Sequence, residues 1–376
     1  MAPMIDTIVL ILGPGMFAVT QPDMFTSSAR WVNAVHAPFG IASKQNPTAR
    51  ELCAGLYKPR LTLTRRLDAQ GVSAVSLKIE LSLPKLLFGE NFSELGTRDF
   101  QKVVQKLTEA LGNMGVIVTP EVLDQATVAA VHYSKNIPLT DGTTPYHFIN
   151  KIKDANIKLS LDVNQTDYRN DGHSYRWHCN SYEVIFYDKI KDLEAAKKSG
   201  KRAIEKDPTS LFELRRTGST LQLPLFDRLR KKKKFEVLRM EVRLNKRDKI
   251  KRLFAALGIK SDLTLKGLFK TVIARKVLLH YLDELESKRP AMLDYRAAND
   301  KALLTALILN NPDLSSKQIL NMFGLKRALE SVSIRELRAM FTKSTSRGFA
   351  RLMGEATLVK VPVDSNVFGA LRRRIK

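Results

Sequence analysis

The sequence predicts an α+β protein in two parts: an antiparallel-rich sheet with helices over residues 1–250, and an α-helical region over residues 251–376. Two observations carry this division. Before residue 250, several segments alternate apolar and polar side chains, which is the period of a half-buried strand. After that point Leu, Lys and Ala dominate, and the apolar residues take the spacing of helices. With 376 residues, the chain is long enough for two or three domains.

The first region contains one clear helix prediction and several strand predictions. Residues 99–114 place their apolar side chains on one face, and Gly112 is a stop signal. Residues 237–244 alternate most strictly, so a strand is expected there. The chain start is expected as a buried first strand rather than a signal peptide, because no basic residues precede its apolar stretch and Asp6 interrupts it. The other expected strands are residues 76–82, 128–133, 157–162 and 177–187.

The charge of the chain points to a polyanionic partner. Lys and Arg number 62 against 38 Asp and Glu, which gives a net charge of +24. Such a surplus indicates nucleic acid or an acidic membrane surface. No apolar run reaches the roughly 18 residues that a membrane span needs. The expected partner is nucleic acid and not a membrane. Cys53 and Cys179 are too few for a zinc site and are expected as reduced thiols in the cytoplasm.

Tyr187 is the candidate nucleophile, at the end of an alternating strand and two residues before Lys189. A phenol with a pKa of about 10 is a weak nucleophile at neutral pH. A nearby cation such as Lys189, or a divalent metal ion, would favour the phenolate or neutralise the phosphate that it attacks. The alternative is a tyrosine at a sheet edge whose hydroxyl faces water.

The later strand carries the second group of candidates, because Arg239, Glu241 and Arg243 share one face by alternation. The carboxylate is either part of a surface ion pair, which contributes little, or a metal ligand or base beside phosphate-binding arginines. Glu80 has the same two interpretations. His132 is either a hydrogen-bonded strand residue or a further ligand. Because the chain has no His-apolar-His pair, the expected cofactor is Mg²⁺ or Mn²⁺ held mainly by carboxylates.

A run of four basic residues comes shortly before this strand. It is either a solvated loop or a set of contacts to the DNA backbone. Its members are Lys231, Lys232, Lys233 and Lys234.

A further DNA-binding candidate lies in the C-terminal region. Residues 314–325 resemble the first helix and turn of a helix-turn-helix, with Ser315 or Ser316 as the cap and Gly324 in the turn. The alternative is an all-α packing domain whose arginines face water. On the DNA-binding interpretation, the second helix carries Arg327, Arg335 and Arg338.

Four segments together resemble a known family. In order and rough spacing over residues 4–250, the sequence is similar to the replication initiators of filamentous phages (inoviruses) and related plasmids, the II/X-type replication proteins. Each motif is weak alone, and the four in order are fairly specific. The segments are residues 4–10 (MIDTIVL), residues 77–91 (LKIELSLPKLLFGEN), residues 186–189 (FYDK) and residues 238–244 (LRMEVRL).

This resemblance implies a rolling-circle initiator, a site-specific nickase whose tyrosine attacks a phosphodiester at the replication origin. The attack leaves a 5′-phosphotyrosine link and a free 3′-hydroxyl that primes a host polymerase, and the displaced strand is later closed into a circle. Tyr187 matches the family's nucleophile, and Glu241 matches a carboxylate of its metal site. The sequence departs from the family at His132, where related phage initiators have an acidic residue. The implied partners are origin DNA, both supercoiled duplex and single strand, and host helicase and polymerase in the bacterial cytoplasm.

Two other function classes explain parts of the sequence. A non-catalytic DNA-binding regulator of a phage or plasmid accounts for the charge and the helical C-terminal region, but not for the order of the four motifs. A tyrosine recombinase needs Arg and His residues around a late tyrosine on a helical scaffold, and the last tyrosine, Tyr295, has no such setting. A nicking assay on supercoiled DNA distinguishes the nickase from the regulator.

Overall fold

The computed structural model describes the chain except for residues 1–2, 29–39, 49–50, 52–56, 68–72, 141, 154–167, 170–172, 195–235, 333, 342–345 and 363–366. The described strands are β1 (Met4–Leu12), β2 (Ala18–Val19), β3 (Thr26–Ser28), β4 (Gly40–Gln45), β5 (Arg60–Leu67), β6 (Ser73–Ser82), β7 (Val116–Ile117), β8 (Thr127–Leu139), β9 (Tyr168–Arg169), β10 (Ser174–His178), β11 (Tyr182–Asp188) and β12 (Glu236–Leu244). In this part of the chain, ten strands form one sheet in the order β3-β4-β5-β6-β1-β8-β12-β11-β10-β9, and β2 pairs with β7. All strand pairings in the described part of this sheet are antiparallel, so the predicted antiparallel-rich sheet is confirmed.

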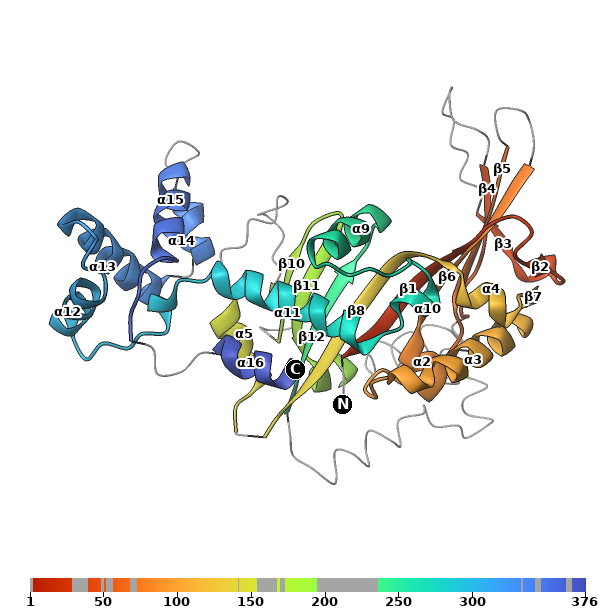
Figure 1. Ribbon diagram of the computed structural model, residues 1–376, viewed down its shortest axis with the longest axis horizontal. Helices are drawn as coiled ribbons and strands as arrows, with labels where there is room; N and C mark the ends of the chain where they lie inside the picture. The colour runs from red at the N-terminus through yellow and green to blue at the C-terminus, as the bar shows by residue number, and fades with distance from the viewer. Residues whose placement is uncertain are drawn as a thin grey trace, which may run out of the picture.

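The first α-helices lie between strands along the chain, and the later ones follow β12. The described α-helices are α2 (Leu83–Phe88), α3 (Phe100–Gly112), α4 (Pro120–Asp124), α5 (Pro145–Ile152), α9 (Arg247–Ala256), α10 (Leu265–Leu268), α11 (Thr271–Ser287), α12 (Asp300–Asn310), α13 (Ser316–Ser331), α14 (Ile334–Met340), α15 (Ser346–Ala356) and α16 (Val367–Ile375). Short 3-10 helices are η1 (Pro22–Met24), η2 (Thr97–Asp99) and η3 (Ala291–Leu293). Figure 1 shows α12 to α15 at one end of the long axis and β3 to β5 at the other.

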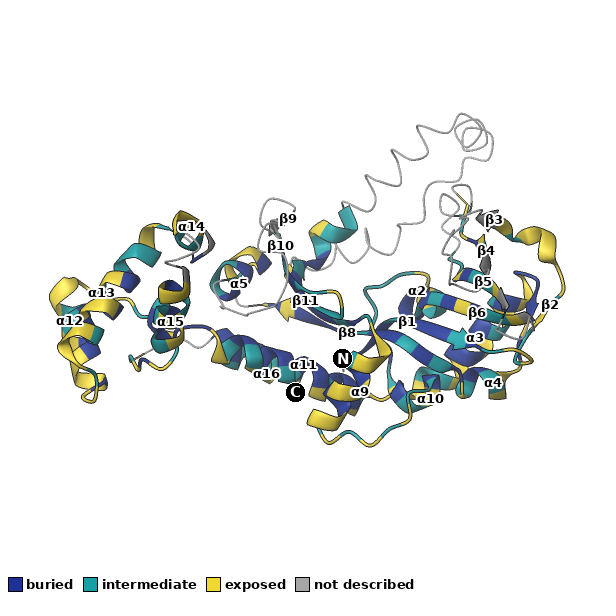
Figure 2. Cartoon of the chain, turned by 90° about the horizontal axis from the view of Figure 1, so that it is seen from above, coloured by how far each residue is buried: buried dark blue, intermediate teal, exposed yellow. Residues whose placement is uncertain are grey.

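The large sheet has one apolar face and one polar face. On β12, Leu238 and the other even-numbered residues to 244 are apolar and buried in the core. The residues between them lie on the opposite face, since successive side chains of a strand alternate. Figure 2 shows α9, α10, α11 and α16 along one side of the sheet. The helices therefore cover the apolar face, and Arg239, Glu241 and Arg243 lie on the other.

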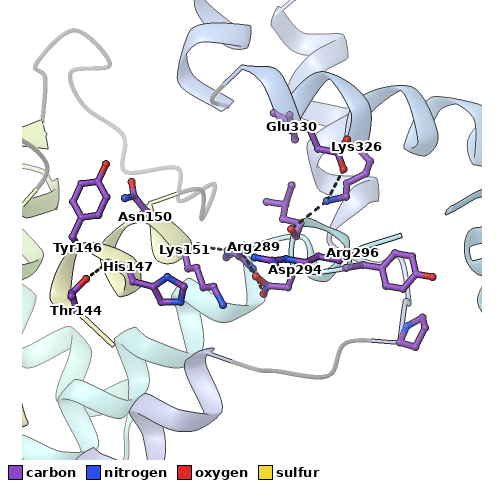
Figure 3. A pocket seen from close by; sticks show the side chains of 14 residues that line it. Thr144, Tyr146, His147, Asn150, Lys151, Arg289, Asp294, Arg296, Lys326 and Glu330 are labelled. Atoms are coloured by element: carbon purple, nitrogen blue, oxygen red, sulfur yellow. Dashed lines mark hydrogen bonds and ion pairs between the residues drawn. The ribbon is translucent and has the colours of Figure 1, made fainter. Parts of the chain in front are cut away.

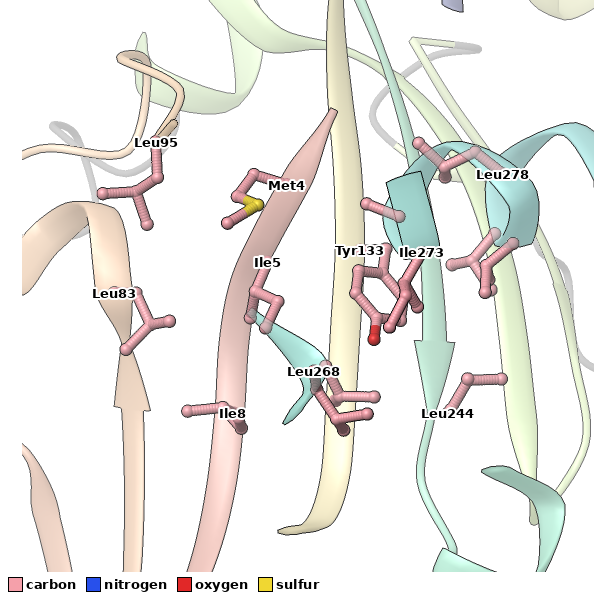
Figure 4. Packing of buried hydrophobic residues seen from close by; sticks show 14 of the residues in the cluster. Met4, Ile5, Ile8, Leu83, Leu95, Tyr133, Leu244, Leu268, Ile273 and Leu278 are labelled. Atoms are coloured by element: carbon pink, nitrogen blue, oxygen red, sulfur yellow. The ribbon is translucent and has the colours of Figure 1, made fainter. Parts of the chain in front are cut away.

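The main core lies between the sheet and these helices. Ile8 of β1 and Tyr133 of β8 are fully buried there, together with Leu268 of α10 and Ile273 of α11 (Figure 4). The last helix, α16, contributes Phe368 and other buried residues to the same core. Residues near the C-terminus thus complete the core that the first strand begins.

A second core lies within α12 to α15 and η3. It contains Met292, Leu303, Met322 and Met353, each buried and separate from the main core. The predicted boundary at residue 250 marks the change from strands to helices, because α9 follows β12 directly. It does not mark the change of core, since α9, α10, α11 and α16 pack on the sheet. The expected two-part division is corrected accordingly: amphipathic spacing shows that a segment is helical, but not which core it joins.

One helix prediction and two strand predictions have different outcomes. The helix expected over residues 99–114 is α3. The single strand expected over residues 177–187 is instead a hairpin of β10 and β11, in which Cys179 N–H donates to the carbonyl of Tyr182 over 2.9 Å. The polar residues between these strands make the turn. The strand expected at residues 157–162 lies outside the described residues.

The predicted turn at Gly324 is wrong, because α13 runs without interruption from Ser316 to Ser331. The predicted cap is confirmed at Ser315, whose hydroxyl accepts from the Gln318 N–H in a capping box. Gly324 sits inside the helix, where apolar packing on both sides of it overrides its low helix propensity. Arg327 therefore belongs to the helix that was expected to end before it.

None of the helices in the described residues is long and apolar enough to cross a membrane.

Candidate active site

The candidate site is a patch of side chains on the polar face of three neighbouring strands. We call it the β8–β12–β11 cluster. Its members meet in cross-strand register, so side chains far apart in the sequence lie side by side. The three rows are Tyr187–Arg239–Asn136, Ile185–Glu241–Ser134 and Glu183–Arg243–His132.

Glu241 is the centre of the cluster, with a side chain only 3% exposed. Its Oε2 accepts from the Tyr187 hydroxyl over 3.3 Å, and its Oε1 accepts from Arg243 Nε over 2.8 Å. His132 Nδ1 lies 3.7 Å from Oε1, and Arg239 Nε lies 3.9 Å from Oε2. Burial by itself would raise the pKa of Glu241, but the charges of Arg243 and Arg239 outweigh it and hold this pKa well below its usual range. Glu241 is therefore an ionised hydrogen-bond acceptor for the tyrosine.

Arg239 is too deeply buried to contact DNA. Its side chain is 2% exposed and forms an ion pair with Asp6 of β1 over 2.7 Å. The same guanidinium donates to Ser134 Oγ over 2.8 Å and to Asn136 Oδ1 over 3.2 Å. It also donates to the carbonyl of Asn91 over 2.9 Å. The expectation that Arg239 contacts the DNA backbone is corrected, because its guanidinium is buried and bonds to groups of the protein instead.

Tyr187 and Lys189 lie together at the end of β11. Burial raises the pKa of Tyr187 well above its ordinary value, and the positive charge of Arg239 opposes this rise. The Lys189 Nζ lies 5.6 Å from the centroid of the Tyr187 ring and 3.1 Å from Asp192. Burial, together with the charge of Arg239, lowers the pKa of Lys189 to about 8. The phenol is thus neutral at rest, with two cations beside it.

His132 and Arg243 form the more accessible side of the cluster. The His132 side chain is 19% exposed and that of Arg243 is 33% exposed. Burial lowers the pKa of His132, against the opposing charge of Glu241, so the imidazole is neutral at pH 7. Arg243 also lies 3.5 Å from Glu183. Arg243 is therefore the arginine of the cluster that is partly exposed to solvent.

The predicted metal ligands do not come together as a set. Glu80 lies on β6, with β1 between it and β8, and pairs with Lys78 over 3.4 Å and Arg60 over 3.8 Å. Its assignment to the site is wrong, because strand alternation fixes the face of a residue but not the order of the strands. His132 and Glu241 do meet, but two arginines neutralise the carboxylate. Across the residues that the structure describes, no group of three or more His, Cys, Asp or Glu side chains could hold a metal ion, so the residues present do not fit the expected cation by themselves.

The basic residues that were predicted to bind DNA, other than those in the cluster, lie in several different places. Residues 231–234, Lys231 to Lys234, lie outside the described residues. Arg327 forms ion pairs with Asp300 over 2.5 Å and Glu330 over 2.6 Å. Arg335 lies on α14, and its side chain is outside the described part. The second helix predicted for a helix-turn-helix does not form as expected, and Arg327 is an ion-paired surface residue.

Sequence reasoning missed the residues that hold Arg239. Two signals were present in the sequence. Asp6 is a carboxylate inside an apolar strand, and Ser134 and Asn136 continue the polar alternation that His132 begins. Asn91 gives only a backbone carbonyl, for which side-chain patterns carry no signal.

A separate cleft of about 870 Å³ lies between α5, η3 and α13, and does not include the cluster. Arg289 links its walls, since Nε donates to the carbonyl of Lys151 over 2.5 Å and the two terminal nitrogens donate to Asp294. On the other side, Lys326 donates to the carbonyl of Leu293 over 3.4 Å (Figure 3). The cleft thus follows the connection between the two cores, and its buried cations are already paired.

Comparison of the chain with models of known families, with curated proteins and with solved structures finds no match. The resemblance to phage and plasmid replication initiators therefore stays a prediction that depends on the sequence motifs.

Proposed function

We propose that this chain is a rolling-circle replication initiator that nicks one DNA strand at a phage or plasmid origin through Tyr187. The observation that supports it best is the hydrogen bond from the Tyr187 hydroxyl to buried Glu241, within a cluster that also contains Arg239, Arg243 and His132. A tyrosine at the surface needs no such surroundings. A tyrosine that attacks a phosphodiester needs a proton acceptor and positive charge beside it.

In the proposed step, Tyr187 Oη attacks phosphorus and the bond from phosphorus to the 3′-oxygen breaks. The phenolic proton passes to Glu241, and neutral His132, 3.7 Å away from that carboxylate, is its final acceptor. The 3′-oxygen leaves with the bonding electrons and takes up one proton from solvent, so a free 3′-hydroxyl and a 5′-phosphotyrosine result. Rejoining is the reverse: a 3′-hydroxyl attacks the phosphotyrosine, and the phenol recovers its proton.

The positive charges have separate roles in this proposal. Arg239 and Lys189 favour negative charge on the Tyr187 oxygen, whose pKa burial otherwise raises. Arg243, with its partly exposed side chain, contacts the phosphate under attack. The proposed steps use only these side chains, and none is assigned to a metal ion, since the described residues do not form a site for one.

The decisive experiment maps a covalent link. Supercoiled DNA cloned from around the gene for this chain is incubated with the protein, with and without Mg²⁺, and nucleotide-linked peptides are identified by mass spectrometry. We expect a nick and one adduct, on Tyr187. We expect Tyr187→Phe to lower the nicking rate by roughly a thousand-fold or more, as for loss of other catalytic nucleophiles, while its affinity for DNA stays the same.

Tyr182→Phe is the matched control, because Tyr182 lies on the same strand but stacks on Tyr281 with 5.2 Å between the ring centroids. Its nicking rate should stay close to that of the wild type. An adduct on another residue would remove Tyr187 from the mechanism. Tight DNA binding with neither nick nor adduct would favour the non-catalytic regulator.

A further inference from the structure

Asp6 occupies an irregular position in the central strand β1. Ile5 pairs with Tyr133 and Thr7 pairs with His132, so Asp6 has no partner of its own on β8. One extra residue on one strand of an antiparallel pair is a β-bulge, which redirects the side chain at that point. The remainder of β1 is almost entirely apolar and buried. The bulge therefore directs the acidic side chain of Asp6 to the polar face of the sheet.

The redirected carboxylate meets the most deeply buried cation of the cluster. Asp6 Oδ1 lies 2.7 Å from a terminal nitrogen of Arg239, and the two side chains are 10% and 2% exposed. A buried guanidinium is costly unless an anion pairs with it. Ser134 and Asn136, whose side chains accept hydrogen bonds from the guanidinium, are neutral. Asp6 thus provides the counter-charge on the side of the guanidinium away from β11.

The remaining donor of Arg239, its Nε–H, lies on the side of Glu241. Among the described residues, Arg239 Nε is buried and has no hydrogen-bond partner. It lies 3.9 Å from Glu241 Oε2, the same oxygen that accepts from the Tyr187 hydroxyl. Because the terminal nitrogens are engaged by Asp6, Ser134 and Asn136, the guanidinium cannot turn, and Nε stays on this side.

We propose that Asp6 is a positioning residue: through the β-bulge it fixes Arg239 so that its Nε–H faces the oxygen of Tyr187. When the phenol loses its proton, this N–H is already in place to stabilise the negative charge, without reorganisation. The role rests on the proposed function of Tyr187. The geometric part, that Asp6 holds Arg239, stands independently of any reaction.

The first test observes Arg239 directly in the full-length chain. The Nε–H signal of Arg239 is recorded by nuclear magnetic resonance on ¹⁵N-labelled protein and identified by its loss in Arg239→Lys. In Asp6→Asn, which keeps the size of the side chain but not its charge, we expect exchange of this hydrogen with solvent to become about ten-fold faster or more. An unchanged exchange rate would show that Asp6 does not hold Arg239 and would overturn the proposal.

The second test measures single-turnover cleavage of a single-stranded oligonucleotide that spans the mapped nick. We expect Asp6→Asn to lower the cleavage rate by roughly 10- to 100-fold with the Kd for this oligonucleotide unchanged. In the background of Arg239→Gln, Asp6→Asn should have little further effect, because Asp6 acts through Arg239. Equal losses in both backgrounds would overturn the proposal, as would a cleavage rate per folded molecule equal to that of the wild type.

The control is Asp124→Asn, since Asp124 is also a partly buried, ion-paired aspartate but pairs with Lys266. It should change neither hydrogen exchange at Arg239 nor the cleavage rate. If Asp6→Asn does not fold, Asp6→Glu is measured in the same two ways, because it keeps the carboxylate but displaces it by one methylene group. Failure of the wild-type chain to form an adduct on Tyr187 would reject the proposed function, whereas the exchange measurement alone decides whether Asp6 holds Arg239.

Discussion

At the scale of single residues, the cluster combines a low-pKa carboxylate with a neutral imidazole. Arg243 and Arg239 keep Glu241 ionised, and burial keeps His132 uncharged at neutral pH. A carboxylate with a depressed pKa accepts a hydrogen bond well but retains a proton poorly. The imidazole next to it is the stronger base, which is why His132 rather than Glu241 is the proposed end point for the phenolic proton.

This assignment predicts how nicking depends on pH. Burial lowers the pKa of His132 from its usual 6.5, so the neutral, proton-accepting form persists below that value. We expect the single-turnover nicking rate to be flat above pH 6.5 and to fall as the pH drops through the lowered pKa, about ten-fold per unit. His132→Gln should lower the rate at pH 7.5 by roughly 100-fold and remove this acid limb.

His147→Gln, on α5 beside the cleft, is the control and should keep the acid limb. A profile of His132→Gln with the same acid limb as the wild type would contradict a role for His132 as base.

The ion pairs of Glu241 also predict the response of the free protein to metal ions. A cation would have to displace Arg243 from a 2.8 Å contact before it could bind the carboxylate. A ligand stabilises a protein only at concentrations near or above its Kd. We therefore expect millimolar Mg²⁺ or Mn²⁺ to shift the Tm of the DNA-free chain by less than about 1 °C. Arg243→Gln, which frees Glu241 next to His132, should show a larger shift, and a rise of several degrees in the wild type would refute the argument.

At the scale of elements, α13 shows that a turn signal can be overridden. Gly324 lies inside this helix, on its exposed side, and a Cβ added there would meet no atom within 4 Å. The helix continues because buried residues on both sides of Gly324, Met322 and Leu325, pack in the second core. The glycine is therefore a weak point within a helix and not a joint between two helices.

Replacing this glycine tests the continuous helix. Gly324→Ala should increase the free energy of unfolding by about 0.5–1 kcal/mol, since alanine is the better helix former and has room here. Chemical denaturation with circular dichroism measures the change. Gly258→Ala serves as the contrast, because Gly258 has a φ of 62°, where a side chain is strained, and it should destabilise the chain. Destabilisation by Gly324→Ala would instead support the turn that was predicted at this glycine.

At the scale of the whole molecule, the C-terminal helix belongs to the sheet and not to its neighbours in sequence. Phe368 and Leu371 of α16 are buried in the main core, although α12 to α15 come just before them and form another core. Arg372 of the same helix also forms an ion pair with Asp283 on α11 over 2.5 Å. The chain thus leaves the sheet, builds the second core and returns.

Because α16 packs in the main core, a substitution in this helix should destabilise the sheet region, although the helix is far from the strands in sequence. Phe368→Ala should lower the free energy of unfolding of the sheet region by about 3–5 kcal/mol, as for other buried aromatic residues. Leu358→Ala, at a position 79% exposed, should change it by less than about 0.5 kcal/mol. Hydrogen exchange resolved by region should place the Phe368 effect in β8 and α11. An effect confined to α12–α15 would contradict the assignment of α16 to the main core.

The sequence by itself determined the local features of this protein. Alternation is a property of neighbouring residues, so it predicted β6 and β12 and placed Arg239, Glu241 and Arg243 on one face. Tyr187 and Glu241, chosen from motifs, do form a hydrogen bond. These predictions succeeded because strand period and helix period depend only on residues within a few positions of each other.

Only the tertiary structure decided which of these residues meet. The pairing of β11 with β12 brings together residues more than fifty positions apart, and the insertion of β1 between β6 and β8 moves Glu80 away while it brings Asp6 in. Strand order and a one-residue bulge depend on the sum of contacts over the whole sheet, which no local pattern contains. The same holds for the helices, whose apolar faces fit either core until the packing of α16 against the sheet selects one.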